Sequence, residues 1–211
     1  MQYARSEKMF CATAALITWF AIIMQLVLII QNRVTGLPET LIRFFSFFTI
    51  LTNILVAVYF TLFSLGKAQR GFWSPPSTAT AIAVYILVVG IVYNIVLRQL
   101  WAPVGMQKIV DELLHLLVPL LFLGYWIFFV SPQAFSWKNA LTWLAYPFLY
   151  LVFVLIRGSF SNYYPYPFLD VYNHGWEKVM FASAAILVLF LLLSCAFIAA
   201  SRFLAGRKVS V

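Results

Sequence analysis

Two carboxylates and an imidazole stand close together where a long apolar stretch of the chain begins. Asp111 and Glu112 precede His115 by four and three residues, so in a helix either carboxylate reaches the ring along one face. Ionisable groups that enter an apolar segment are costly and usually face a protein interior or a wet cavity. A carboxylate-oriented histidine is a common base for activating a hydroxyl nucleophile. This stretch is therefore the centre of a candidate site for acyl transfer.

The hydroxyl expected to attack is that of Thr49, with His115 as the base that takes its proton. The residues expected to orient the ring or to stabilise an oxyanion are Asn53, Asn94, Arg98, Asp111 and Glu112. Each residue type also has a structural interpretation, because threonine bonds its own helix, asparagine joins helices and arginine reaches phosphates. The chain has no Gly-x-Ser-x-Gly elbow, so the prediction rests on these groups converging in space.

Composition places the chain among integral membrane proteins. Its 211 residues are 64% hydrophobic and 9% charged, whereas a soluble domain is about half apolar and about a quarter charged. The net charge of +8 is scattered near segment ends, which favours anionic lipid head groups as partners over nucleic acid. The two cysteines, Cys11 and Cys195, lie in apolar runs and form no disulfide or metal pattern. We expect no metal and no cofactor.

The hydropathy pattern predicts an all-α protein, a bundle of six transmembrane helices forming a single domain over residues 1–211. Each apolar run has about the length needed to cross a bilayer, which is roughly 20 residues. The predicted spans are Met9–Gln31, Leu41–Leu65, Thr78–Leu97, Leu113–Val130, Asn139–Ile156 and Val179–Phe203. Eight lysines and arginines fall on the side of both termini and six on the other, which indicates cytoplasmic termini.

This topology brings the polar residues of four spans into one half of the bilayer. Thr49 lies about eight residues, or roughly 12 Å, beyond Leu41 in an unbroken second span. Asn94 and Arg98 close the third span, His115 lies about a turn inside the fourth, and Arg157 ends the fifth. We expect no comparable polar set in the cytoplasmic half. The convergence, more than any single residue, indicates a functional cavity.

The connection between the fifth and sixth spans, Arg157–Lys178, is the longest and is rich in tyrosine and proline. Tyrosine suits the membrane interface, and proline favours an extended backbone over a helix. The segment is expected to be either an interfacial cap or a lid over the site. Its candidate lid or binding residues are Arg157, Tyr164, Tyr166 and Asp170.

Several short motifs occur together in an order that resembles one family. They are Phe47–Asn53, Val92–Arg98, Asp111–His115 with Pro119, Tyr146-Pro147 through Arg157-Gly158, and Tyr164–Asp170. From about Phe44 to Trp176 the chain resembles the bacterial six-helix membrane proteins of the "Pr-six-Pr" type. The resemblance implies the six-helix fold and the bacterial inner membrane, and it says little about activity.

More remotely, the chain is similar to the animal androgen-induced, FAR-17a-like membrane proteins. These are threonine hydrolases that cleave fatty acid esters of hydroxy fatty acids with a threonine in span two and a histidine in span four. The resemblance implies Thr49 and His115 as the matching residues. Here the spacing from Thr49 to Asn53 is one residue longer and includes Thr52, which is a rival nucleophile. The animal proteins carry other polar residues around the histidine, so Asp111 and Glu112 inherit no role.

Three functions therefore follow as hypotheses. The first is an intramembrane threonine hydrolase of lipid esters that uses Thr49 and His115. The second is a non-catalytic membrane protein, or a transporter, that binds lipid or an amphipathic small molecule. The third is a structural subunit that holds other membrane proteins through its aromatic surface. The sequence leaves the substrate and the oligomeric state open.

Overall fold

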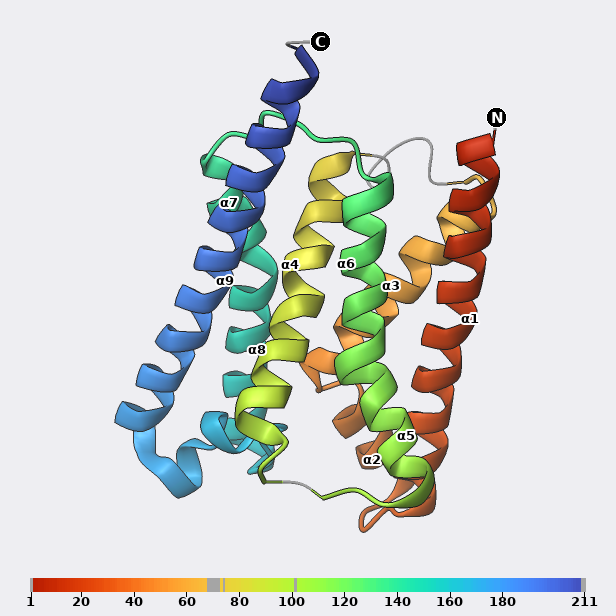
Figure 1. Ribbon diagram of the computed structural model, residues 1–211. Coiled ribbons are helices and arrows are strands. Elements are labelled where there is room, and N and C mark those ends of the chain that lie inside the picture. Colours follow the sequence, from red (N-terminus) through yellow and green to blue (C-terminus); the bar gives the residue numbers. More distant parts are fainter. Residues whose placement is uncertain (1, 68–72, 74, 101, 210–211) are drawn as a thin grey trace. The chain divides into compact units, whose positions relative to one another are not determined.

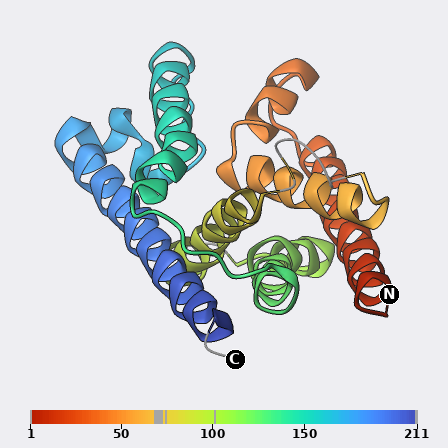
Figure 2. The ribbon, with the colours of Figure 1, turned by 90° about the horizontal axis from the view of Figure 1, so that it is seen from above.

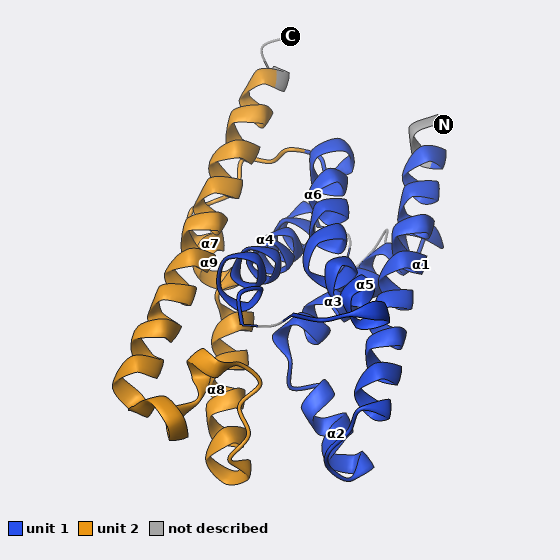
Figure 3. Ribbon diagram, turned by 60° about the horizontal axis from the view of Figure 1, so that its bottom comes forward, with its two compact units in different colours: residues 1–131 blue, residues 132–211 orange. Residues whose placement is uncertain are grey.

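The computed structural model describes residues 2–67, 73, 75–100 and 102–209. Every regular element in these ranges is a helix, which confirms the predicted all-α class. The chain divides into two compact units, residues 1–131 and 132–211 (Figure 3). The single domain over 1–211 stays a prediction.

Unit 1 holds the candidate site, and Figure 1 labels the α-helices of this unit. Its helices are α1 (Gln2–Gln31), α2 (Leu37–Phe44), α3 (Phe48–Ser64), α4 (Pro76–Val92), η2 (Tyr93–Leu97), α5 (Gly105–Glu112), η3 (Leu113–Leu117) and α6 (Val118–Phe129). Both η2 and η3 are π-helical turns inside longer helices. Unit 2 consists of α7 (Lys138–Trp143), α8 (Ala145–Ser161), the 3-10 turn η4 (Pro167–Leu169) and α9 (Val171–Val209).

The described residues contain five helices that are long and apolar enough to cross a membrane, or six if α2 and α3 together form one span. The count of six spans therefore depends on a pair that bends by 69°. The unbroken second span predicted over Leu41–Leu65 is wrong. Likewise, the helical segment that carries His115 begins at Gly105 instead of Leu113, so Asp111 lies well inside it.

The break between α2 and α3 has a local cause. The hydroxyl of Ser46 donates a hydrogen bond to the carbonyl of Ile42 at 2.6 Å, and Phe47 takes an extended backbone conformation. A serine that bonds the preceding turn competes with the helical ladder and bends the chain. Thr49 is consequently in the first turn of α3, and the predicted depth of about eight helical residues below Leu41 does not hold.

In unit 1, α3 contacts both α1 and α4, while α6 lies beside α4 (Figure 2). The buried cluster near the candidate site draws on α1, α2, α3, α5 and η3. Its members are Ala21, Ile22, Phe44, Ile50, Ala57, Val110 and Leu114. Because these elements share one apolar cluster, the start of α3 and the turn that carries His115 are fixed in the same packed region.

In unit 2 the predicted long connection Arg157–Lys178 is much shorter, because α8 continues to Ser161 and α9 starts at Val171. Asn162 ends α8 in the left-handed conformation, which asparagine tolerates better than most residues. Gly175 has φ 77° and ψ 162°, so it breaks the helical backbone near the start of α9. The positive φ at this point suits glycine, which has no Cβ.

Candidate functional site

The imidazole of His115 is held by Asp111, the residue one helical turn before it. Its Nδ1 lies 2.9 Å from the backbone carbonyl oxygen of Asp111 and 3.3 Å from the carboxylate Oδ1. Both partners are acceptors, so Nδ1 is the nitrogen that carries the hydrogen. In the neutral ring, Nε2 then holds the lone pair and is the atom that exchanges protons. The side chains of His115 and Asp111 are 12% and 8% exposed, which limits competition from water.

Tyr93, from the facing helix, completes this arrangement. Its hydroxyl donates a hydrogen bond to Oδ2 of Asp111, and its ring stacks on the imidazole of His115 with centroids 3.8 Å apart and planes 14° apart. The two oxygens of Asp111 are thus shared between a phenol and an imidazole. A buried carboxylate requires such partners, because desolvation without hydrogen bonds is very costly.

Glu112, the other carboxylate predicted to orient the ring, has a different partner. It forms an ion pair with Arg98 at 2.7 Å. The hydrogen bond to Glu112 raises the pKa of Arg98, whose guanidinium also lies 5.6 Å from the centroid of the Tyr93 ring. The structure therefore assigns the orienting contact to Asp111, and Arg98 and Glu112 form a half-exposed pair beside it.

The two asparagines predicted for the site bond backbone carbonyls of η3. Asn53 donates to the carbonyls of Thr49 at 2.8 Å and Leu114 at 3.4 Å. Asn94 donates to the carbonyls of Gly90 at 2.8 Å and His115 at 3.2 Å. Each amide nitrogen faces two acceptors, which fixes the orientation of both amide groups.

Pro119 explains why these two carbonyls need side-chain donors. In an α-helix the backbone N–H of residue 119 would bond the carbonyl of His115, and in a π-helix it would bond that of Leu114. Proline has no N–H, and its ring clashes with the carbonyl of the residue four positions before it. The chain widens into the π-turn Leu113–Leu117 just before Pro119, and Asn53 and Asn94 supply the missing hydrogen bonds. Their amide donors therefore stabilise the turn that carries His115, which differs from the predicted role at an oxyanion.

Gly90 lets the facing helix approach this turn. A Cβ at position 90 would lie 3.2 Å from the carbonyl oxygen of His115 and 3.3 Å from Cβ and Cγ of Pro119. Because these distances are shorter than ordinary van der Waals contact, a residue with a side chain at position 90 would require α4 or α6 to shift. The close approach brings Asn94 within reach of the His115 carbonyl, one turn further along.

Thr49, the predicted nucleophile, is 7% exposed and lies on the helix that contacts η3. It is joined to the site through Asn53, which bonds both its carbonyl and that of Leu114. Thr52, the rival nucleophile, is fully buried on the same helix. The first turn of a helix carries partial positive charge, which favours negative charge that develops on a group such as the Thr49 oxygen.

The candidate lid residues belong to unit 2 and have structural contacts there. Arg157 donates to the carbonyl of Tyr163 at 3.3 Å, and the ring of Tyr166 stacks on Phe168 with planes 3° apart. The ring of Tyr164 covers Gly158 so closely that a Cβ there would lie 2.0 Å from it. Burial and the charge of Asp170 raise the pKa of Tyr164. The lid stays a prediction.

Asp170 caps α9. Its Oδ1 accepts the backbone N–H of Asn173 at 3.0 Å, and its Oδ2 accepts the side-chain amide of the same residue at 2.6 Å. An aspartate that accepts the N–H of the third helical residue is a standard N-cap. Desolvation of Asp170 acts to raise its pKa, but the hydrogen bonds from Asn173 outweigh this effect and hold the pKa of Asp170 below its usual range.

We expect Asp170→Ala to lower the free energy of unfolding of α9 by about 1 kcal/mol, because the cap is lost. Asp170→Asn keeps an acceptor and should cost less at neutral pH. Since the folded-state pKa is lowered, the contribution of the charge is present at neutral pH and disappears as the pH falls through the folded pKa. Amide hydrogen exchange at residues 171–174, compared at neutral and acidic pH, measures both effects. Equal exchange in all three proteins would refute the cap.

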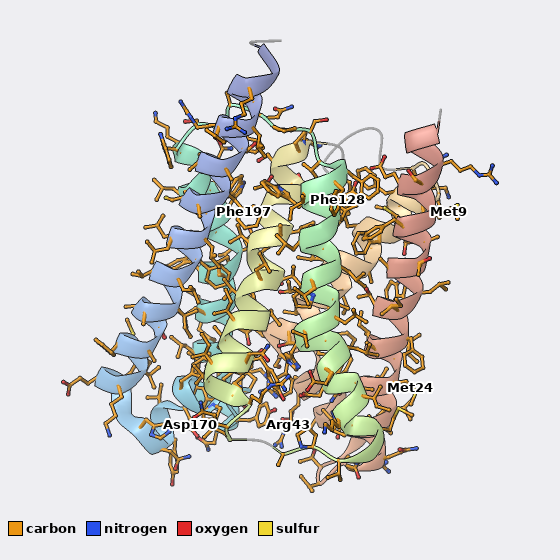
Figure 4. All side chains as sticks on the ribbon, viewed as in Figure 1. Met9, Met24, Arg43, Phe128, Asp170 and Phe197 are labelled. Atoms are coloured by element: carbon orange, nitrogen blue, oxygen red, sulfur yellow. The ribbon has the colours of Figure 1, made fainter. Side chains whose placement is uncertain are left out.

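A second polar cluster lies at the opposite end of unit 1, where the sequence predicted none. Tyr125 donates a hydrogen bond to Glu7 at 3.0 Å, and its hydroxyl lies 3.4 Å from that of Tyr59. Figure 4 places Met9 and Phe128, close neighbours of Glu7 and Tyr125 in the chain, at the end of unit 1 away from α5. Both tyrosines are buried among aromatic rings, so this cluster joins α1, α3 and α6.

Tyr93 is the member of the site that the sequence prediction missed. It directly precedes Asn94, a predicted site residue, but a tyrosine in an apolar run is typical of ordinary packing. The signal that could have found it is Asp111, because a carboxylate inside an apolar helix requires a donor from a neighbouring helix.

Comparison of the chain with family models, with curated proteins and with solved structures found no match. The resemblances to the six-helix bacterial family and to the animal threonine hydrolases therefore remain expectations drawn from the motifs.

Proposed function

We propose that this chain is an intramembrane hydrolase of lipid esters, in which His115 is the general base and Thr49 the nucleophile. The observation that supports the proposal is the contact between Asp111 and Nδ1 of His115 inside a helix long and apolar enough to cross a membrane. A carboxylate that fixes the tautomer of a histidine is the arrangement by which hydrolases activate a hydroxyl. Burying both groups in an apolar helix is costly, which argues for a functional use.

The reaction would run in two steps. The Thr49 oxygen attacks the ester carbonyl carbon while its proton passes to Nε2 of His115. The carbon–oxygen bond to the alcohol then breaks, and the proton on Nε2 passes to the departing oxygen. In the second step a water molecule gives a proton to Nε2 and attacks the acyl carbon. The bond between that carbon and the Thr49 oxygen then breaks, and the proton on Nε2 returns to Thr49 as the fatty acid leaves. The carboxylate of Asp111 stabilises the imidazolium in both steps.

The negative charge of the tetrahedral intermediate needs donors other than the two asparagine amides, which are engaged by carbonyls. The partial positive charge at the start of α3 is close to Thr49 and provides electrostatic stabilisation. The break between α2 and α3 is what creates this helix terminus. Under this proposal the bend, which the sequence did not predict, is part of the catalytic arrangement.

Covalent labelling tests the nucleophile. A fluorophosphonate bearing an alkyl chain should label the wild-type protein, and mass spectrometry of the labelled peptide should place the adduct on Thr49. We expect Thr49→Ala to lose the label, whereas Thr52→Ala, on the same helix, keeps it. Labelling that survives Thr49→Ala and is lost in Thr52→Ala would move the nucleophile to Thr52. The absence of label from the folded wild-type protein would refute the hydrolase.

One observation favours the second candidate function, a non-catalytic protein that binds a lipid or another amphipathic molecule. The acceptor oxygen of Asn53 is fully buried and has no hydrogen-bond partner among the described residues. A buried acceptor of this kind suits a ligand hydroxyl or amide. In that case a hydroxylated lipid should raise the Tm of the purified protein with no turnover, and Asn53→Leu should remove the stabilisation.

A further inference from the structure

Tyr93 has two separate contacts with the pair Asp111 and His115. The hydroxyl reaches one carboxylate oxygen, and the ring covers the imidazole at a centroid distance of 3.8 Å. The hydroxyl therefore acts on the orientation of the carboxylate, and the ring acts on the orientation of the imidazole. Tyr93 is 5% exposed, so solvent does not compete for the hydroxyl.

The carboxylate of Asp111 could rotate about its Cβ–Cγ bond if only His115 held it. The hydrogen bond from Tyr93 to Oδ2 selects the rotation that leaves Oδ1 3.3 Å from Nδ1 of His115. The stacked ring limits rotation of the imidazole about its own bonds. Together with the backbone carbonyl of Asp111, 2.9 Å from Nδ1, these contacts keep the hydrogen on Nδ1 and the lone pair on Nε2.

Tyr93 is itself placed by the backbone around it. It opens the π-turn Tyr93–Leu97, in which the N–H of Arg98 bonds the carbonyl of Tyr93 at 2.8 Å. A π-turn rotates the following residues relative to an α-helix, and such turns recur at functional sites. The next residue, Asn94, bonds the carbonyl of His115 at 3.2 Å. Two adjacent residues of this turn therefore hold His115. Asn94 bonds its backbone carbonyl, while Tyr93 stacks on its ring and bonds the Asp111 carboxylate that faces it.

We propose that Tyr93 is a positioning residue that reinforces one tautomer of His115 by holding the Asp111 carboxylate against Nδ1, and so presents Nε2 as the proton-exchanging atom. The inference rests on the proposed function for its catalytic consequence, but the tautomer itself is a property of the resting protein. The two are therefore separable by experiment.

The test is ¹⁵N NMR of the two imidazole nitrogens in protein labelled at histidine and reconstituted in lipid nanodiscs. The chain has two histidines, so a His174→Gln background leaves His115 as the only signal. At a pH where the ring is neutral, we expect the hydrogen on Nδ1 in this background protein. Tyr93→Phe keeps the stacked ring but removes the hydroxyl, and it should lower the share of the tautomer with hydrogen on Nδ1. Asp111→Ala removes the carboxylate but keeps the backbone carbonyl 2.9 Å from Nδ1, so it should weaken the preference further without abolishing it.

Tyr85→Phe, two turns earlier on α4, is the matched control and should leave the His115 signals unchanged. In ester hydrolysis Tyr93→Phe should lower kcat about ten- to hundredfold with little change in KM, as expected for a misplaced catalytic group. An unchanged tautomer in folded Tyr93→Phe would overturn the inference, whatever the activity. A changed tautomer in a protein that hydrolyses no ester would support the inference and refute the proposed function.

Discussion

Replacement of His115 by glutamine is expected to lower kcat for fatty ester hydrolysis by about 100- to 10,000-fold, the usual contribution of a general base. Glutamine keeps a polar side chain of similar reach but cannot accept and return a proton at neutral pH. KM should change little, because the ring contacts Asp111 and Tyr93 in the resting protein. Steady-state kinetics with a series of fatty esters of different chain lengths measures both constants.

His174→Gln is the matched control for this experiment. His174 lies in unit 2, at the start of α9, where its backbone N–H bonds the carbonyl of Asp170 at 3.0 Å. The same substitution there should leave kcat unchanged. If folded His115→Gln protein hydrolyses esters as fast as the wild type, the role of His115 as base is wrong.

Loss of the Asn94 side chain is expected to lower the free energy of unfolding by about 1–3 kcal/mol, because the part-buried carbonyl of His115 loses its side-chain donor. The carbonyl of Gly90 also loses the Asn94 amide but keeps the backbone N–H of Tyr93. If the carbonyl of His115 needs Asn94 because Pro119 has no N–H, then Pro119→Ala, which restores an N–H, should make Asn94→Ala less destabilising. We expect a coupling of at least about 0.5 kcal/mol between the two substitutions.

Equilibrium unfolding in mixed micelles of the wild type, the two single variants and the double variant completes this cycle. Asn32→Ala is the control, because Asn32 also bonds the carbonyl four residues before it, at 2.9 Å, but in an exposed position at the end of α1. Its effect should be small and independent of Pro119. Strict additivity of Asn94→Ala and Pro119→Ala would show that the proline and the asparagine are unrelated.

The π-turn also connects stability with function. Leu113–Leu117 carries His115, and two helices hold its carbonyls through Asn53 and Asn94. Variants that weaken these hydrogen bonds should therefore shift the ring as well as the unfolding equilibrium. The two asparagines that the sequence suggested for an oxyanion thus hold the turn that carries His115, the proposed base.

The sequence alone determined the features that depend on composition and on spacing within one helix. The apolar runs predicted helices of membrane length, and the four-residue spacing of Asp111 and His115 predicted that one can hold the other. Both follow from the geometry of a single helix, which is the same wherever that helix lies. The choice between Asp111 and Glu112 could not be made, because both spacings are compatible with contact.

Only the tertiary structure decided which residues from other helices complete the site. Tyr93 and Asp111 are 18 residues apart and meet because Gly90 lets α4 approach the turn before Pro119. Which helices pack together in this way is not specified by the apolar pattern of any one helix. For this reason the sequence indicated the histidine and its carboxylate, while the tyrosine, the proline and the asparagines acquired their roles only in the folded chain.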